Sequence, residues 1–252
     1  MNLLNGRLRI SLGLLVASLT ALPAALAGTV NLVPVADTTL QEAFPNNNFG
    51  GGLTLTAGGR RQGGRTRALM QFDVAGSLPA GAVITAVSLT LSVVGVPSGG
   101  VNSTFDLNRM LASWGEGTGA DQGGSLAGAG QATWNNRFGS SGSPWGTAGG
   151  DFSSTVSASR NITGLGSYAF SSTADLIADV QAWYDNPSSN FGWLMRSESE
   201  TTATSIRRFG SRADSLSSPT LTIQFSVVPE PGVCLLLGLG LAVLGWTRRW
   251  RR

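Results

Sequence analysis

The chain has 252 residues, with 17 arginines, 14 acidic residues, no lysine, no histidine and one cysteine. Without histidine, a catalytic or metal site lacks its commonest general base and ligand, and Cys234, in the apolar C-terminal segment, leaves the rest of the chain without a disulfide or a thiol nucleophile. Residues 28–228 hold 11 of the arginines and 13 of the acids, a net charge of −2, which excludes the basic stripe of a nucleic-acid-binding protein.

The N-terminus has the three parts of a secretory signal peptide. Two arginines precede an apolar run at residues 10–22, and Ala25 and Ala27 form a small-x-small cleavage site. The sequence therefore predicts a signal peptide over residues 1–27 and a mature chain that begins at Gly28. The apolar run is short and ends before Pro23, which disfavours a membrane-spanning helix.

Alternating apolar and polar residues predict short strands through the first half of the mature chain. We place them at residues 30–35, 53–56, 68–74, 87–93 and 104–111, of which 87–93 has the clearest alternation. Arg109 falls on the apolar face of the last strand. Because a buried guanidinium needs a carboxylate partner, we expect Asp73 or Glu116 to pair with it.

The second half begins with a glycine- and serine-rich stretch, residues 114–165, which predicts a long loop with one or two short strands at most. A helix follows, capped by Ser172 or Thr173 and ended by Pro187. Further strands are predicted at 191–196, 204–209 and 220–227. Many short strands and one short helix indicate an all-β domain over residues 28–228, a jelly-roll-like antiparallel β-sandwich.

The C-terminus has three parts in order. Pro229, Glu230 and Pro231 keep the chain extended, residues 233–246 are apolar, and four arginines follow. A helix of this length spans about 21 Å, short of the roughly 30 Å hydrocarbon core, so it predicts a marginal membrane anchor. The alternative, a buried C-terminal helix, is disfavoured by the arginines that end the chain: Arg248, Arg249, Arg251 and Arg252.

This tail, residues 229–252, resembles the PEP-CTERM sorting signal of Gram-negative bacteria. The resemblance implies export through the inner membrane by the translocon and handling by an exosortase, a membrane protease-transpeptidase. It further implies that the protein is anchored in the inner membrane, at least transiently through residues 233–246, and then reaches the cell surface or an extracellular polysaccharide matrix.

Most of the mature chain resembles the DNRLRE domain, a family that is similar to carbohydrate-binding jelly rolls. The residues that carry the likeness include Ala36-Asp37-Thr38, Asn48-Phe49-Gly50, Phe72-Asp73, Ser113-Trp114-Gly115-Glu116, Thr133-Trp134-Asn135 and Asn190-Phe191-Gly192. The insertion at residues 134–165 departs from the family pattern. The resemblance implies a sugar-binding β-sandwich.

A sugar site needs aromatic faces, and arginines if the sugar is acidic. Trp134 and Trp145 lie in glycine-rich loops and are expected at the surface, with a core position as the alternative, whereas Trp183 is expected in the core. Two arginine clusters predict either an anionic-polysaccharide surface or, as the alternative, a solvated face or ion pairs within the domain. Their members are Arg60, Arg61, Arg65 and Arg67, and Arg207, Arg208 and Arg212.

Signals for metal binding and catalysis are weak. The oxygen-bearing turn residues Asp37, Asn46, Asn47, Asn48, Asp185 and Asn190 suit a structural calcium, but turn chemistry explains them equally. No spacing marks a catalytic carboxylate pair. We therefore expect no catalytic residue, no cofactor and no metal site, and a structural calcium is the alternative that no motif supports.

Taken together, these patterns predict an exported, non-catalytic surface or matrix protein associated with exopolysaccharide. Two alternatives stay open. One is a specific carbohydrate-binding module for an acidic polysaccharide. The other is a polysaccharide-degrading enzyme, since a glycoside hydrolase needs only two carboxylates at the right separation.

Overall fold

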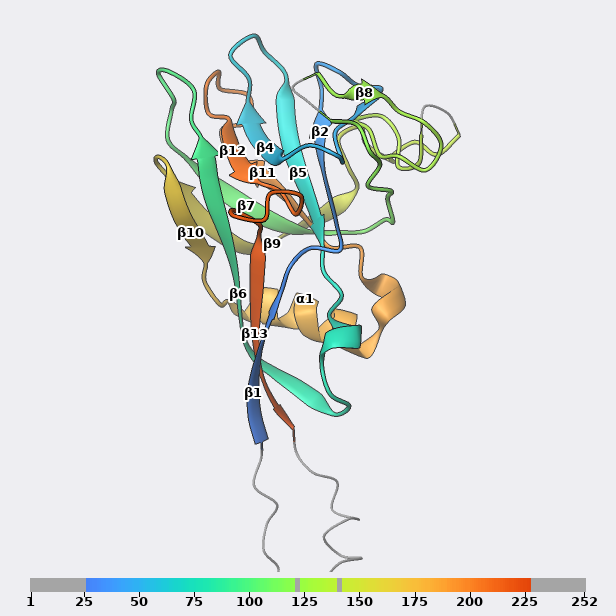
Figure 1. Cartoon of the computed structure of the whole chain (residues 1–252), viewed down its shortest axis with the longest axis vertical. Helices are drawn as coiled ribbons and strands as arrows, with labels where there is room; N and C mark the ends of the chain where they lie inside the picture. The colour runs from blue at the N-terminus through green and yellow to red at the C-terminus, as the bar shows by residue number, and fades with distance from the viewer. Residues whose placement is uncertain (1–25, 121–122, 140–141, 228–252) are drawn as a thin grey trace, which may run out of the picture. The chain divides into compact units, whose positions relative to one another are not determined.

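The structure is a computed structural model that describes residues 26–120, 123–139 and 142–227. These residues form a mostly antiparallel β-structure with a single α-helix (Figure 1). The elements are β1 (Leu26–Leu32), β2 (Ala36–Gln41), β3 (Asn47–Asn48), β4 (Thr54–Gly59), β5 (Arg65–Gln71), η1 (Ala75–Ser77), β6 (Ala82–Gly95), β7 (Ser103–Met110), β8 (Ser125–Leu126), β9 (Phe152–Ile162), β10 (Gly166–Phe170), α1 (Ala174–Asp185), η2 (Pro187–Ser189), β11 (Trp193–Ser197), β12 (Arg207–Gly210) and β13 (Thr220–Val227).

Eleven strands form one sheet that curls on itself into a half-barrel sandwich, which confirms the predicted fold class. One layer contains β1, β13, β6, β12 and β4, with β10 beside β6. The other contains β2, β5, β11, β7 and β9. The β4–β5 hairpin joins the layers at Gly58, whose φ is +115° and where a Cβ would lie 2.7 Å from the Ile206 backbone. This corner therefore needs glycine.

The main core lies between the two layers and under α1. Its fully buried side chains come from both layers and from the helix, because alternate residues of each strand point inward. Trp183 of α1 packs on Trp193 of β11 with ring centroids 4.4 Å apart, and Phe72 contacts Trp193 edge-on. The expected core position of Trp183 is confirmed.

The outer face of the second layer carries a second apolar cluster. Leu40, Leu69, Met110 and Leu194 point away from the main core and are covered by the long loop between β7 and β9. The loop adds three tryptophans to this cluster, so it packs as a third layer. The members from the loop are Trp114, Ala132, Trp134 and Trp145.

The helix α1 begins as predicted, with the Thr173 hydroxyl accepting a hydrogen bond from the Leu176 amide. It lies beside β6 in Figure 1 and brings Asp179 to within 3.0 Å of the Arg109 guanidinium. The expectation that Asp73 or Glu116 pairs with Arg109 is wrong. The Asp73 carboxylate instead accepts a hydrogen bond from the Gly76 amide in η1, and Glu116 binds Arg212.

The interpretation of residues 114–165 as mainly loop needs correction. Its last part forms β9, an eleven-residue strand that pairs with β7, and β10 follows directly but pairs with β6 in the other layer. Most residues of β9 are exposed or half-buried, and many are serine or threonine. Its sequence therefore lacks the apolar–polar alternation that predicts a strand. Of the first predicted strand, residues 30–35, only 30–32 are strand, at the end of β1; the chain leaves the strand before the buried Pro34, and β2 begins at Ala36.

The two ends of the described domain are direct neighbours. Strands β1 and β13 lie side by side (Figure 1), with Leu26 paired to Val227. The ring of Phe225 lies over Gly28. Residues 1–25 of the predicted signal peptide (1–27), residue 228 and the predicted sorting segment (229–252) lie outside the described residues, whereas Leu26 and Ala27 belong to β1. No helix of the described residues is long and apolar enough to cross a membrane.

Candidate functional site

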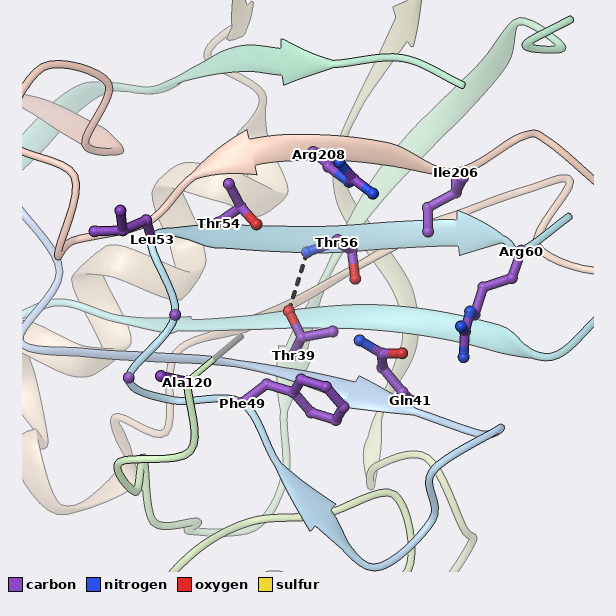
Figure 2. Close-up of a pocket in the computed structure, with 12 residues that line it drawn as sticks. Thr39, Gln41, Phe49, Leu53, Thr54, Thr56, Arg60, Ala120, Ile206 and Arg208 are labelled. Carbon is purple, nitrogen blue, oxygen red and sulfur yellow. Dashed lines mark hydrogen bonds between the residues drawn. The ribbon is translucent and has the colours of Figure 1, made fainter. Parts of the chain in front are cut away.

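A groove of about 390 Å³ opens at the edge of the sandwich where β2 faces β4 and β12. Figure 2 shows its side chains converging from these strands and from the loops around them. Threonines and a glutamine form its polar floor, arginines flank it, and a few apolar side chains complete its walls. The lining residues are Thr39, Gln41, Phe49, Gly51, Gly52, Leu53, Thr54, Thr56, Arg60, Ala120, Ile206 and Arg208.

One side of the groove is formed by β12, in which the residues alternate between the core and the surface. Arg207 and Phe209 are buried, so Arg208 between them is exposed. Arg208 pairs with Gly95 of β6, and its side chain lies over that glycine, where a Cβ would be 3.1 Å from the Arg208 Cδ. The missing side chain of Gly95 thus makes room for the aliphatic part of the Arg208 side chain beside the groove.

Arg60 extends from the end of β4 into the groove (Figure 2), with its guanidinium 4.9 Å from the ring of Phe44. Its Nη1 atom is shielded from solvent and has no hydrogen-bond partner among the described residues, and the same is true of the Thr56 hydroxyl. Buried polar atoms without partners are rare in folded proteins. A hydroxyl or carboxylate of a ligand, or an ordered water, would satisfy both groups.

The threonines of the floor were not identified as site residues from the sequence. Thr54 and Thr56 alternate with Leu53 and Leu55, which is the pattern that predicted a strand there. The same alternation places both hydroxyl groups on one face of β4. Thr39 reaches the groove from β2, and its hydroxyl accepts a hydrogen bond from the Thr56 amide at 3.0 Å. Only the fold brings β2 and β4 together.

The first predicted arginine cluster is divided by the structure. Arg60 lines the groove, and Arg61 is exposed on the β4–β5 turn outside it. Arg65 binds Glu42 through two side-chain hydrogen bonds of 3.0 and 2.7 Å, and this pairing raises the pKa of Arg65 and lowers that of Glu42. Arg65 is half-exposed, so one part of it still faces solvent.

Of the second cluster, only Arg208 lines the groove. Arg207 is fully buried, and it donates hydrogen bonds of 3.0 Å to the carbonyl oxygens of Ile206 and Val101. Burial lowers the pKa of its guanidinium. Arg212 is exposed at the end of β12, but its guanidinium is bound by both carboxylate oxygens of Glu116. The expected surface role of Arg207 is therefore wrong, because Arg207 occupies an inward-facing position on β12.

The expected exposure of Trp134 and Trp145 is also wrong, since both lie in the second apolar cluster. The indole N–H of Trp145 donates to the Thr133 carbonyl at 2.9 Å. The ring of Trp134 lies about 5 Å from the guanidinium groups of both Arg65 and Arg67. The glycine-rich loop folds back on the sheet and buries its aromatic side chains, so neither ring is a free stacking platform.

A buried carboxylate supports the loop wall of the groove. Asp37 of β2 accepts a 2.7 Å hydrogen bond from the Arg212 amide, and its own amide donates to Glu116. The loop that holds Arg212 also contacts the groove wall, since the Ser211 hydroxyl donates a hydrogen bond to the carbonyl of Gly52, which lines the groove. Burial raises the pKa of Asp37 from 3.8 to about 7, and the nearby Glu116 carboxylate adds to this, whereas the amide of Arg212 opposes it.

This raised pKa predicts how stability depends on pH. Because the folded state holds the proton more tightly than the unfolded chain, Asp37 stabilises the fold most below about pH 4, and this contribution is lost as the pH rises through 7. A shift of this size corresponds to about 4 kcal/mol. We expect Asp37→Asn, which keeps an acceptor for the Arg212 amide, to remove most of the decline in melting temperature between pH 5 and 8.

The control for this prediction is Asp185→Asn, since Asp185 is exposed at the end of α1. Thermal unfolding followed by circular dichroism across this pH range distinguishes the two variants. A wild-type profile that is parallel to the Asp37→Asn profile would show that Asp37 is ionised normally in the fold.

No group of three or more histidine, cysteine or acidic side chains is arranged to hold a metal ion in the described part of the chain. The residues considered for calcium are used in internal hydrogen bonds. Asn48 is fully buried and donates to the carbonyls of Glu116 and Ala132, and Asn190 donates to the Phe72 carbonyl. These contacts match the turn and loop roles that were the alternative to calcium binding.

Two family models match the chain. Residues 28–121 match carbohydrate-binding module family 96, and residues 227–252 match the PEP-CTERM protein-sorting motif. No curated protein matches it. The first match comprises β1 to β7, and the remaining strands complete the same layers. Of the residues that line the groove, only Ile206 and Arg208 lie outside this first match. The matches suggest carbohydrate binding and exosortase-dependent surface sorting.

Proposed function

Because the chain is a PEP-CTERM protein with a carbohydrate-binding-module-like domain, we propose that it is a non-catalytic surface protein that binds an acidic extracellular polysaccharide in the groove between β2, β4 and β12. The observation that carries the proposal is the pair of arginines at the groove. Arg60 and Arg208 have no carboxylate partner among the described residues. Guanidinium groups bind carboxylates and sulfates through paired hydrogen bonds.

The remainder of the groove suits a sugar. Thr39, Thr54, Thr56 and Gln41 supply donors and acceptors for sugar hydroxyls, and Phe49 and Leu53 supply apolar contact. Leu53 is 65% exposed, so it is available to a ligand. A mixture of this kind, polar groups around a small apolar surface, is typical of sites for ligands with both hydroxyl and C–H faces.

The lining of the groove also supports a binding role rather than hydrolysis. Hydrolysis of a glycosidic bond by the common mechanism needs two carboxyl groups that flank it. No acidic residue lines the groove, and the nearby Asp37 and Glu116 are held by Arg212. The proposal therefore assigns the protein to binding, and incubation with the bound polysaccharide is expected to release no reducing ends.

Affinity electrophoresis of the exported protein tests the proposed function. We expect polygalacturonate in the gel to retard the protein at moderate salt, and a neutral dextran at equal mass to leave its mobility unchanged. Retardation should weaken as salt is raised, because the arginines are at the surface and their interactions are screened. Equal mobility in both gels, or equal retardation by both polymers, contradicts the preference for acidic chains.

The sorting part of the proposal makes a separate prediction about mass. The exported protein is expected to begin at Gly28 and to lack the segment after the Pro229, Glu230 and Pro231 motif, since an exosortase acts near it. Intact-mass measurement of protein recovered from the cell surface reports both ends. A surface protein that retains Arg252 contradicts cleavage of the tail, whereas binding of polysaccharide is tested independently.

A further inference from the structure

The groove does not end at Arg60. A second hollow of about 380 Å³ shares Arg60 with it and lies against the β4–β5 turn. A third hollow of about 590 Å³ shares Arg65 with the second and lies between β5 and the end of the long loop. The three hollows therefore follow one another across the β4–β5 end of the sandwich, from the groove toward the long loop.

Charge is distributed unevenly along these hollows. The groove has two arginines and no acidic residue, as described above. In the second hollow, Glu42 and Glu200 are present, but each is bound by an arginine through two hydrogen bonds of 2.7 to 3.0 Å. The third hollow contains Asp151, which accepts hydrogen bonds from the amides of Gly146 and Thr147.

The two arginine–glutamate pairs, Arg65 with Glu42 and Arg67 with Glu200, bind different ligand groups than unpaired charges do. A guanidinium and a carboxylate that already neutralise each other still have unused donors and acceptors at the surface, which suit the hydroxyl groups of a sugar. Phe152 and Leu111 add apolar surface to the third hollow, and Leu111 is 53% exposed. Beyond Arg60, the second and third hollows are thus suited to neutral parts of a glycan, whereas the groove, with Arg60 and Arg208, is suited to its acidic groups.

We propose that the three hollows form one continuous tract that binds an internal stretch of a long polysaccharide, with acidic groups recognised between Arg60 and Arg208 and hydroxyl groups recognised beyond Arg65. This inference rests on the proposed function of the groove and extends it. Because the tract continues beyond the groove, the protein binds within chains, and its affinity rises with chain length until the tract is filled.

Three exposed alanines provide the test, because each lines a different hollow. Ala120 lies in the groove, Ala203 in the second hollow and Ala148 in the third. Replacing any of them by tryptophan fills its hollow from the surface without removing a packed side chain or a charge. Ala80→Trp is the matched control, since Ala80 is also exposed but lies in the turn before β6.

The experiment is isothermal titration calorimetry of the full chain with hyaluronan oligosaccharides, in which acidic and neutral sugars alternate, from a disaccharide to a decasaccharide. We expect the decasaccharide to bind at least about tenfold more tightly than the disaccharide, a difference of about 1.4 kcal/mol. Ala203→Trp and Ala148→Trp should abolish most of this gain and leave disaccharide binding unchanged. Ala120→Trp should weaken binding at every length, and Ala80→Trp at none.

The outcomes separate this inference from the proposed function. If chain length does not change the affinity and Ala203→Trp and Ala148→Trp bind the decasaccharide like wild type, the tract is overturned and the groove remains. If no oligosaccharide of any length binds, the proposed function fails, and the tract fails with it. Circular dichroism melting confirms that each variant is folded before its affinity is interpreted.

Discussion

Replacing Arg60 and Arg208 together by glutamine is expected to lower the affinity for an acidic polysaccharide about 100-fold, or about 2.8 kcal/mol. Each guanidinium is placed to make charge-assisted hydrogen bonds to the ligand, which contribute about 1.5 to 3 kcal/mol apiece before solvent screening. Neither arginine has a salt-bridge partner among the described residues, so the substitution removes no internal ion pair. Affinity electrophoresis or calorimetry measures the loss.

The matched control removes the same total charge elsewhere. Arg61 and Arg160 are both exposed and lie outside the groove, and neither forms a salt bridge with another described residue. Arg61→Gln combined with Arg160→Gln is expected to change the affinity less than threefold, through long-range attraction alone. Equal losses in the two double variants would mean that the protein binds by overall charge and that the groove confers no specificity.

Removing the carboxylate of Glu200 is expected to destabilise the fold by about 3 to 5 kcal/mol, because it leaves the Arg67 guanidinium buried without its partner. The two side chains are 6% and 10% exposed and share hydrogen bonds of 3.0 and 2.7 Å. Arg67 also lies about 5 Å from the rings of Trp134 and Phe152 and donates to the Gly149 carbonyl, so it cannot turn to solvent without disturbing the long loop. We expect Glu200→Ala to lower the melting temperature by roughly 10 °C.

A second ion pair, whose arginine lies on the same strand β5 as Arg67, provides the comparison. Arg65 and Glu42 have the same two-bond geometry but are 35% and 36% exposed. Glu42→Ala is therefore expected to cost at most about 1 kcal/mol. A second variant, Arg67→Met with Glu200→Leu, should recover much of the stability that Glu200→Ala loses, since no buried charge remains. Similar costs for Glu200→Ala and Glu42→Ala would show that the Arg67 pair is hydrated in solution.

The contrast between these two pairs explains why the sequence could not identify the site. Arg65 and Arg67 are two residues apart in the same strand and look equivalent in the sequence. The difference is made by residues far along the chain, since Glu200 is 133 positions from Arg67, and the long loop covers one arginine more than the other. The same holds for Arg207 and Arg208, which point to opposite sides of β12.

The tryptophans of the long loop show a second limit of sequence patterns. Glycine-rich sequence around Trp134 and Trp145 is compatible with an exposed loop or with one that packs on a sheet, and local composition does not choose between them. The outer face of β5 and β11 carries Leu69 and Leu194, which need an apolar cover. The tryptophans provide that cover, so burial of the sheet face decided their place.

The sequence by itself determined the β class of the domain, the capped helix and the sorting motif, because each of these depends on a local pattern: alternation along a strand, a cap with an apolar stripe, or a short linear signal. The tertiary structure alone decided which arginines are free at the surface, that Asp179 is the partner of Arg109, and that Thr39 and Thr56 share a groove with Arg208. The physical reason is that charge pairing and burial depend on neighbours in space, and in this fold those neighbours come from distant parts of the chain.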